Sequence, residues 1–417
     1  MTERTPSGHV TVIGAGVVGA STALFLRRAG YEVTLIERGE PGMGTSYGNA
    51  GLLSVTGTIP VATPGILWKV PKLLMNPLAP LTIRWSYLPK LAPWLWQFIR
   101  SSSPARVQEI SAVLAGLVAH GQDSYRALLG DEDFAALTQG GGMMLVYETD
   151  QSFEASRWKT DLRRSHGARI DYVPAEQIRQ LEPALAPIYK HALHVPGTRY
   201  VKNPLSLTQA IARKLVEAGG EIVADEVQRI EAAAGAAPVI VAKGGRRRTD
   251  RVVIAAGAWS RALARQCGAD VPLDTERGYH AMFRNPKVAP RLSVMSGDYD
   301  FAATPMEHGL RIAGTVELGG LEAAPNYARA EHLMQHGKRM FDGLDGAETD
   351  FWMGFRPSMP DSLPVIGPVP GNDRVYLAFG HGHLGVTFGA VTGRLITDMI
   401  AGRKPPIDVS PLRADRF

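Results

Sequence analysis

The chain has 417 residues, 45% of them hydrophobic and 20% charged, which is typical of a globular protein and excludes a disordered one. Its 45 Lys and Arg against 40 Asp and Glu give a formal net charge of +5, too small an excess to indicate nucleic-acid binding but compatible with anionic substrates or an anionic lipid surface. The single cysteine, Cys267, excludes an internal disulfide and a cysteine-based metal site. We therefore predict two domains, no nucleic-acid partner and no metal.

The segment 9–37 contains the clearest motif. An apolar strand leads into a turn with Gly14, Gly16 and Gly19, a helix follows, and a second strand ends at Glu37. In such a unit the first glycine makes the tight turn, the second lets a pyrophosphate approach the backbone, and the third lets the helix pack closely on the strand. The helix N-terminus favours the pyrophosphate, and Glu37 is placed to accept hydrogen bonds from ribose hydroxyls. The motif predicts a dinucleotide site but fits both NAD and FAD.

Two further glycine turns lie downstream. The loop 42–54 follows Glu37 almost at once and is dense in small residues, which favours a longer cofactor that is wrapped at its pyrophosphate and beyond. Much later, the apolar run that begins at Arg251 predicts a buried parallel strand, and it ends in a turn at Gly257.

A last strand–turn–helix unit comes near the C-terminus. The strand 375–379 ends at the glycine turn 380–385, and a helix begins near Val386. A helix N-terminus at this point would stabilise the negative charge that a flavin gathers at N1 and O2 on reduction, a feature that an NAD enzyme does not need. The glycine turns together favour FAD.

The stretch 64–99 is rich in tryptophan and basic residues, with Trp68, Trp85, Trp94 and Trp96. Such side chains suit a membrane interface, so peripheral membrane contact is one interpretation. The interpretation we favour is a proline-broken insertion whose tryptophans pack on the substrate domain. No stretch has the apolar length of a spanning helix, and the short polar segment before the first strand is no signal peptide. We expect a cytoplasmic protein, at most peripheral on the inner membrane.

The basic run Arg246–Arg248 is interpreted as a solvated hairpin tip between two strands. Alternating residues at 309–314 predict an antiparallel sheet outside the dinucleotide unit.

Taken together, the motifs resemble those of the FAD-dependent D-amino-acid dehydrogenase family, flavoproteins of the D-amino-acid oxidase type with bacterial D-hydroxyproline dehydrogenases as close relatives. The resemblance covers most of the chain. It rests on the opening glycine motif with Glu37, Gly44-Thr45-Ser46, Asn49-Ala50-Gly51, Ala256-Gly257-Ala258-Trp259-Ser260, Arg277-Gly278-Tyr279-His280, Arg356-Pro357 and Gly380-His381-Gly382. The chain departs from the common pattern at His383, where the family often has Thr, and at Val386 and Phe388.

The resemblance implies an α/β fold with two discontinuous domains. We expect a Rossmann-like FAD-binding domain with a parallel sheet, made of 1–62, 198–264 and 350–417. We expect an α+β substrate-binding domain on a mostly antiparallel sheet, made of 63–197 and 265–349. Without a cysteine where a covalent flavin link is expected, the FAD is predicted to be non-covalent. The predicted FAD contacts are Gly14, Gly16, Val17, Val18, Gly19, Glu37, Arg38, Thr45, Ser46, Asn49, Ala50, Gly51, Val227, Ala256, Gly257, Trp259, Gly380, Gly382, His383, Leu384, Gly385, Val386 and Thr387.

The resemblance also implies the reaction, oxidative deamination of a D-amino acid, with D-proline and hydroxy-D-proline as candidates. The α-hydrogen passes as hydride to flavin N5, and the imino acid hydrolyses to an oxo acid, or a cyclic substrate gives a pyrroline. A quinone or another respiratory-chain component would take the electrons. A carboxylate substrate calls for an arginine fork, and the resemblance places Arg277, Tyr279 and Arg356 near the substrate and His381 at the flavin edge.

Other functions remain open at this point. An FAD oxidase of secondary amines such as sarcosine or glycine would use oxygen instead. A flavin-binding electron-transfer partner would have no substrate of its own, and an NAD-dependent reductase would be colourless.

Overall fold

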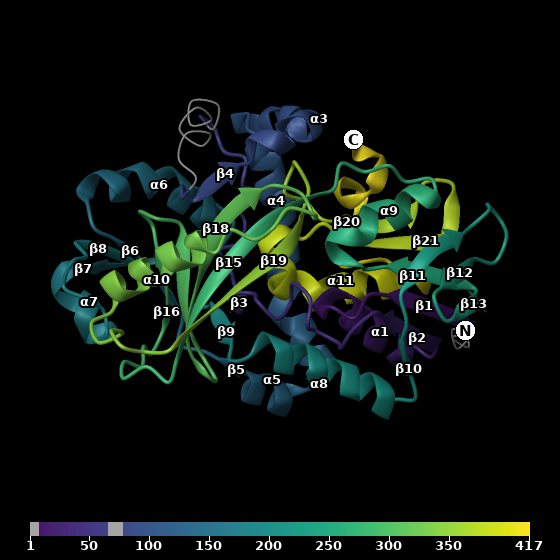
Figure 1. The fold of residues 1–417 in the computed structure, drawn as a ribbon, viewed down its shortest axis with the longest axis horizontal. Helices are drawn as coiled ribbons and strands as arrows, with labels where there is room; N and C mark the ends of the chain where they lie inside the picture. Colours follow the sequence, from purple (N-terminus) through teal and green to yellow (C-terminus); the bar gives the residue numbers. More distant parts are fainter. Residues whose placement is uncertain (1–7, 66–77) are drawn as a thin grey trace.

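The computed structural model describes residues 8–65 and 78–417. A parallel sheet with the C-terminal strands lies at one end of the molecule and a larger sheet at the other, with long helices packed against both (Figure 1). The parallel sheet has the strand order β10-β2-β1-β14-β21-β20, and its first five strands run parallel whereas the last is antiparallel. These strands are β1 (His9–Ile13), β2 (Glu32–Glu37), β10 (Glu221–Ala224), β14 (Arg251–Ile254), β20 (Val365–Val369) and β21 (Asn372–Phe379).

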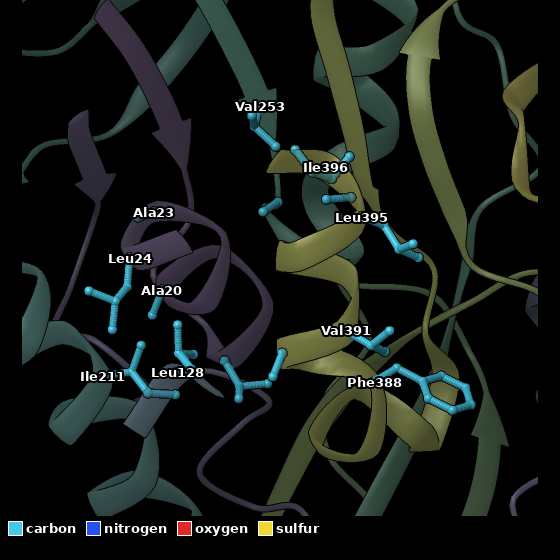
Figure 2. Close-up of a cluster of buried hydrophobic side chains, with 14 of the residues drawn as sticks. Ala20, Ala23, Leu24, Leu128, Ile211, Val253, Phe388, Val391, Leu395 and Ile396 are labelled. Carbon is cyan, nitrogen blue, oxygen red and sulfur yellow. The ribbon is translucent and has the colours of Figure 1, made fainter. Parts of the chain in front are cut away.

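Four helices cover one face of this sheet. They are α1 (Val17–Arg28), α4 (Pro104–Leu129), α8 (Pro204–Glu217) and α11 (Gly385–Ile400). Figure 2 shows the core between them, where Leu24, Leu128, Ile211 and Ile396 have no exposed surface. Full burial of one such side chain contributes about 1.5–3 kcal/mol. The backbones of α1 and α11 come close at Gly393, because a Cβ there would lie 2.8 Å from the carbonyl carbon of Ser21.

The opposite face carries α9 (Ser260–Gln266) and an antiparallel ribbon of β11 (Val227–Glu231), β12 (Val239–Ala242) and β13 (Gly245–Arg248). The prediction of a hairpin tip at Arg246–Arg248 is wrong, since these residues form β13 itself and pair with β12. The turn lies just before them, at Lys243–Gly244. The arginines are exposed because β13 is an edge strand of a ribbon, and a basic edge discourages pairing with another chain.

The larger sheet is mostly antiparallel, as predicted, and has the order β19-β15-β18-β17-β16-β6-β8-β7, with β4 also paired to β18. Its strands are β4 (Leu81–Ile83), β6 (Met143–Tyr147), β7 (Asp171–Pro174), β8 (His191–Val195), β15 (Asp274–Arg284), β16 (Ser293–Ser296), β17 (Phe301–Met306), β18 (Gly309–Leu318) and β19 (Thr349–Ser358). Helix α10 (Ala328–Met340) packs on one face of β15 and β18, where Phe283, Ile312 and Leu333 join one apolar cluster. The helices α6 (Asp150–Ser165) and α7 (Ala175–Leu181) flank this sheet, whereas Phe134 of α5 (Asp131–Leu137) joins the core of the parallel-sheet part.

A small sheet of β3 (Leu52–Leu53), β9 (Arg199–Val201) and β5 (Thr138–Gln139) joins the two parts. The predicted domain limits shift in two places. The limit at 350 falls inside β19, which pairs along its length with β15 of the larger sheet. Helix α4, expected in the substrate domain, buries Ile110, Leu114 and Leu117 in the core of the parallel-sheet part. Both elements therefore lie across the division drawn from the sequence.

The tryptophan-rich stretch contains α3 (Leu88–Arg100). Trp94 is 5% exposed and its indole N–H donates to the carbonyl of Ser358 at 3.4 Å, so it packs as expected for an insertion. Trp85 and Trp96 are 64% and 58% exposed, and the prediction for Trp68 falls outside the described residues. In the described part of the chain, no helix is both long and apolar enough to cross a membrane.

Candidate active site

The glycine turns, far apart in sequence, meet around one cavity of about 490 Å³, a size typical of ligand sites. Gly14 has a φ of +101°, which favours glycine, and its N–H donates to the carbonyl of Ile36 at 2.8 Å. A Cβ on Gly14 would lie 2.6 Å from the carbonyl oxygen of Ala255, so the first turn packs directly on the turn after β14. A Cβ on Gly19 would lie 1.8 Å from the carbonyl oxygen of Gly14, which shows the close helix–turn packing expected of the motif.

The carboxylate of Glu37 lies at the rim of the first turn. One of its oxygens accepts from the N–H of Ala15 at 2.7 Å and the other accepts from the N–H of Gly39 at 3.2 Å. At the N-terminus of α1, the N–H of Val17 donates to the hydroxyl of Ser46 at 3.0 Å. An acidic side chain at the strand tip and N–H groups at a helix N-terminus are the features that hold the ribose and the pyrophosphate of a dinucleotide.

The second glycine loop is tied to both domains. The N–H of Gly42 donates to the carbonyl of Ala15 at 2.9 Å, and the hydroxyl of Thr45 donates to the carbonyl of Phe355 on β19 at 2.7 Å. Beside it, the guanidinium of Arg38 stacks over the ring of Trp259, 4.0 Å from its centroid. The loop therefore fixes the larger sheet against the cavity.

The C-terminal turn closes the cavity. His381 is 4% exposed, and its Nε2 lies 2.9 Å from the hydroxyl of Thr392 on α11. Burial lowers the pKa of His381 to about 3, so the ring is neutral at physiological pH. The backbone of His381 also forms an isolated antiparallel bridge with Ser358, at the end of β19.

The structure brings most of the sequence-predicted cofactor residues to this cavity, together with His381. They are Gly14, Gly16, Val17, Val18, Glu37, Arg38, Thr45, Ser46, Asn49, Val227, Ala256, Gly257, Trp259, Gly382, Gly385 and Val386. The others lie off its lining and support it or neighbour it. They are Gly19, Ala50, Gly51, Gly380, His383, Leu384 and Thr387.

Sequence reasoning missed other residues on the lining, among them Asp225 and Glu226 in the link from β10 to β11 and Gln228 on β11. The N–H of Asp225 donates to the carbonyl of Glu37 at 2.9 Å. These residues reach the cavity because β10 pairs in parallel with β2, which brings the end of β10 beside the end of β2. The sequence of neither strand indicates this pairing, so no sequence signal could have identified them.

Arg356 on β19 lies beside the C-terminal turn. Two of its N–H groups donate to backbone carbonyls of β18, at 2.9 Å to Thr315 and 3.2 Å to Gly314. Thr315 has a φ of +57° at a bulge in the pairing of β15 with β18, and this bulge presents the two carbonyls together. Burial lowers the pKa of Arg356, and the nearby carboxylate of Glu276 opposes that shift. The guanidinium still carries its charge, because arginine is effectively always protonated.

His383 lies close enough to Arg356 for the two side chains to interact electrostatically. The protein around its ring partly removes it from water, and this desolvation, aided by the positive charge of Arg356, lowers its pKa to about 4. A neutral imidazole beside a guanidinium is the result.

The structure places Arg277 and Tyr279 elsewhere. They are 0% and 1% exposed and contact the carboxylate of Glu317, at 3.3 Å from a guanidinium nitrogen and 2.5 Å from the phenol oxygen. Arg84 also pairs with Glu317 at 2.6 Å. Tyr279 belongs to the apolar cluster under α10, on the sheet face away from Arg356. We therefore place Arg277 and Tyr279 in a buried ion-pair cluster around Glu317 rather than beside the substrate.

In residues 8–65 and 78–417, no three His, Cys, Asp or Glu side chains are grouped in a way that could hold a metal. Cys267 is 7% exposed, and burial raises the pKa of its thiol to about 11.

Residues 9–399 match the family model described as FAD dependent oxidoreductase, DAO. The chain belongs to this family of FAD-dependent oxidoreductases. A D-amino-acid oxidase of Bradyrhizobium diazoefficiens is 39% identical over 421 residues, 99% of this chain and all of the relative. A D-amino acid dehydrogenase of the same organism is 29% identical over 416 residues, 98% of each chain. The prediction of a D-amino-acid oxidase-type flavoenzyme is thus confirmed at the level of the family.

Solved structures establish the fold. Glycine oxidase from Geobacillus kaustophilus superposes with a TM-score of 0.76 at 21% identity, covering 99% of each chain. L-Proline dehydrogenase from P. horikoshii superposes with a TM-score of 0.73 at 18% identity, covering 99% of this chain and 98% of that one. At such identities the comparison concerns the fold alone.

The cavity fits the FAD of this family. Its walls have glycines where backbone must approach a pyrophosphate, and at Gly14 a side chain would collide with Ala255. Glu37 lines the cavity, where its carboxylate would accept hydrogen bonds from ribose hydroxyls, and Gly382 and Gly385 place the N-terminus of α11 on the same cavity.

Proposed function

We propose that the protein oxidises a D-amino acid at its α-carbon, with D-proline and hydroxy-D-proline among the candidates. The observation that carries the proposal is the position of Arg356, which is next to Pro357 on the lining of the FAD cavity and two residues before the bridge from Ser358 to His381. The names of the two curated relatives support a D-amino acid as the substrate class. When bound, FAD accepts the α-hydrogen of the substrate with its electron pair.

Arg356 would bind the substrate carboxylate. Two of the five N–H groups of its guanidinium are fixed to carbonyls of β18, so the charged fork is held in one orientation and its other donors would bind the carboxylate. A fixed carboxylate in turn fixes the distance of the α-carbon from the cofactor, which is the main contribution a protein makes to this chemistry.

The amine must be neutral when the α-hydrogen leaves, because its lone pair assists that departure. With a pKa of about 4, the imidazole of His383 is too weak a base to take the proton of an ammonium group at neutral pH. We propose that solvent removes this proton instead. The product imino acid would hydrolyse to an oxo acid and ammonia, or remain as a pyrroline if the substrate is cyclic.

We propose a quinone or another respiratory-chain component as the final electron acceptor. A second candidate is molecular oxygen, favoured by the name of the relative at 39% identity, an oxidase. Non-covalent FAD is part of the proposal, since the one cysteine is buried at the C-terminal end of α9 and absent from the cavity lining.

The test is an anaerobic screen of D- and L-amino acids, including proline analogues, scored by loss of flavin absorbance. D-substrates should bleach the flavin, and reoxidation by a quinone analogue or by air then identifies the acceptor. Bleaching by L-amino acids or sarcosine, but not by D-amino acids, would overturn the assignment. A flavin that no amino acid bleaches would indicate an electron-transfer protein.

We also propose peripheral membrane contact through α3 and the segment before it. Trp85 and Trp96 are exposed, as are Lys90 and Arg100 of α3, and the guanidinium of Arg100 stacks over the ring of Trp96, 4.5 Å from its centroid. Co-sedimentation with vesicles of anionic phospholipid should fall when both tryptophans are replaced by serine. Binding that is unchanged by W85S/W96S would remove α3 from this role.

A further inference from the structure

We infer that Trp352 forms the wall of the substrate site beside Arg356 and that the enzyme prefers amino acids with a large apolar or aromatic side chain. The inference rests on the proposed function and names its substrate class. Trp352 is four residues before Arg356 on β19, so both side chains project from the same face of that strand. This face is opposite to the one that α10 covers.

A pair of glycines brings the two side chains together. Gly278 on β15 is the register partner of Gly354 on β19, midway between Trp352 and Arg356. A Cβ on Gly278 would lie 2.3 Å from the central carbon of the Arg356 guanidinium, and a Cβ on Gly354 would lie 2.0 Å from the indole of Trp352. Real Cβ atoms do not come this close to other atoms, so the guanidinium and the indole occupy the space that side chains at these two glycines would fill. The two groups therefore lie next to each other on the same face of the sheet.

The indole is clamped in place. One of its faces stacks on the ring of His280, with centroids 5.1 Å apart and 19° between the planes. The ring of Tyr47 meets it edge-on at 5.9 Å. A Cβ on Gly48 would lie 1.8 Å from the indole, so the second glycine loop leaves a slot for it. Trp352 is nevertheless only half-buried, which leaves part of a rigid apolar surface free for a ligand.

The charges around the exposed part of Trp352 limit which substrate side chains can bind there. Arg311 donates to the carbonyls of Tyr47 and Asn49 at 2.8 and 2.7 Å, and burial lowers its pKa to about 10, so it stays cationic at neutral pH. With Arg356 it makes the surroundings of Trp352 positive, whereas His280 and His383 are neutral. A cationic side chain is therefore disfavoured. An indole face favours apolar and aromatic groups through area burial and ring stacking.

A purely structural role for Trp352 is the competing interpretation, since the indole also fills the slot under Gly48. The two roles differ in what a substitution changes. If Trp352 is only structural, its substitution should change kcat/KM by the same factor for every substrate. If it contacts the substrate, the change should depend on the substrate side chain.

The experiment compares the wild-type holoenzyme with Trp352→Phe and Trp352→Ala, using D-phenylalanine, D-alanine and D-arginine as substrates. We expect the wild type to have the highest kcat/KM with D-phenylalanine and the lowest with D-arginine. Trp352→Ala should lower kcat/KM for D-phenylalanine by about tenfold or more and for D-alanine by much less, with Trp352→Phe in between. Phe351→Leu, a neighbouring aromatic on the α10 side of β19, is the matched control and should leave the substrate order unchanged.

Binding without turnover gives a second readout. Benzoate and acetate share the carboxylate, so their dissociation constants, from the change in flavin absorbance, should converge in Trp352→Ala because the preference for benzoate is lost. Equal effects on both ligands and on all substrates would overturn the inference, and so would a wild-type enzyme that favours D-alanine or D-arginine. If Trp352→Ala does not fold, the wild-type order and the Trp352→Phe variant decide the matter. If no D-amino acid bleaches the wild-type flavin, the proposed function fails instead, and the benzoate–acetate comparison still tests the wall.

Discussion

Ser358 and His381 form an isolated antiparallel bridge that joins the end of β19 to the C-terminal glycine turn. Arg356 on β19 and His383 in the turn Gly382–Leu384 each lie two residues from this bridge, and the positive charge of Arg356 contributes to the lowered pKa of His383. One backbone bridge thus brings the proposed carboxylate-binding residue to the edge of the FAD cavity.

Arg356→Ala should raise KM far more than it changes the affinity for FAD. Loss of a charge-assisted bond is worth about 2 kcal/mol, or roughly thirtyfold in KM. Arg356→Lys should restore only part of this, since an ammonium lacks the planar fork. Steady-state kinetics on protein saturated with FAD makes the measurement, and an unchanged KM in Arg356→Ala would exclude the role.

Glu37→Gln should weaken FAD binding. A carboxylate that accepts hydrogen bonds from ribose contributes about 1.5–3 kcal/mol, which corresponds to roughly ten- to a hundredfold in the dissociation constant. Glu32→Gln is the matched control, because Glu32 is an exposed acid at the other end of β2. Titration of the apoprotein with FAD, followed by flavin fluorescence, compares the two, and equal affinities would contradict the position we give to Glu37.

Glu317→Gln should destabilise the fold by about 3–5 kcal/mol, because it leaves the buried guanidinium of Arg277, and the partly buried one of Arg84, without their shared carboxylate. Glu317 is 2% exposed and Arg277 is 0% exposed, so solvent cannot compensate. The exposed Glu322 of the neighbouring loop provides the control, Glu322→Gln. Denaturant unfolding gives the free energies.

A substitution of Tyr279 tests whether the Glu317 cluster is separate from the substrate site. Tyr279→Phe should lower the free energy of unfolding but leave KM within about twofold of the wild type, because the phenol bonds Glu317 on the face away from Arg356. A large rise in KM without loss of stability would return Tyr279 to the substrate site.

Acid should destabilise the protein through its buried histidines. Burial, aided by the charge of Arg311, lowers the pKa of His280 to about 3, whereas the unfolded chain has a value near 6.5. Between these pH values the unfolded state binds more protons, so the free energy of unfolding falls as the pH falls, by about 1.4 kcal/mol per pH unit for each such histidine. His280→Gln should flatten this slope below pH 6.5. The exposed His308 gives the control, since His308→Gln should leave the slope unchanged.

The sequence was most informative where a backbone conformation admits few residue types. Gly14 and Gly19 revealed a turn in which side chains collide with neighbouring backbone, and apolar runs such as 251–254 revealed the strands of a buried parallel sheet. Both are local properties, because sterics and burial act within a few residues. The family motifs extended this to FAD.

Other features depend on which strand faces which. Alternation along β15 says that Arg277 and Tyr279 share a face, but not that this face packs on α10 while Gly278 and His280 face Arg356 and Trp352. Helix α4 was assigned to the wrong part of the molecule for the same reason, because an apolar helix face does not indicate which element it packs against.

By itself, the sequence determined a dinucleotide fold, its glycine turns and its flavin cofactor. It could do so because positions that admit only glycine form motifs that can be recognised locally in the sequence. Only the tertiary structure decided which cations face a ligand and which are buried in ion pairs. That choice depends on strand register and on the bridge between Ser358 and His381, and it arises from contacts between segments far apart in the chain.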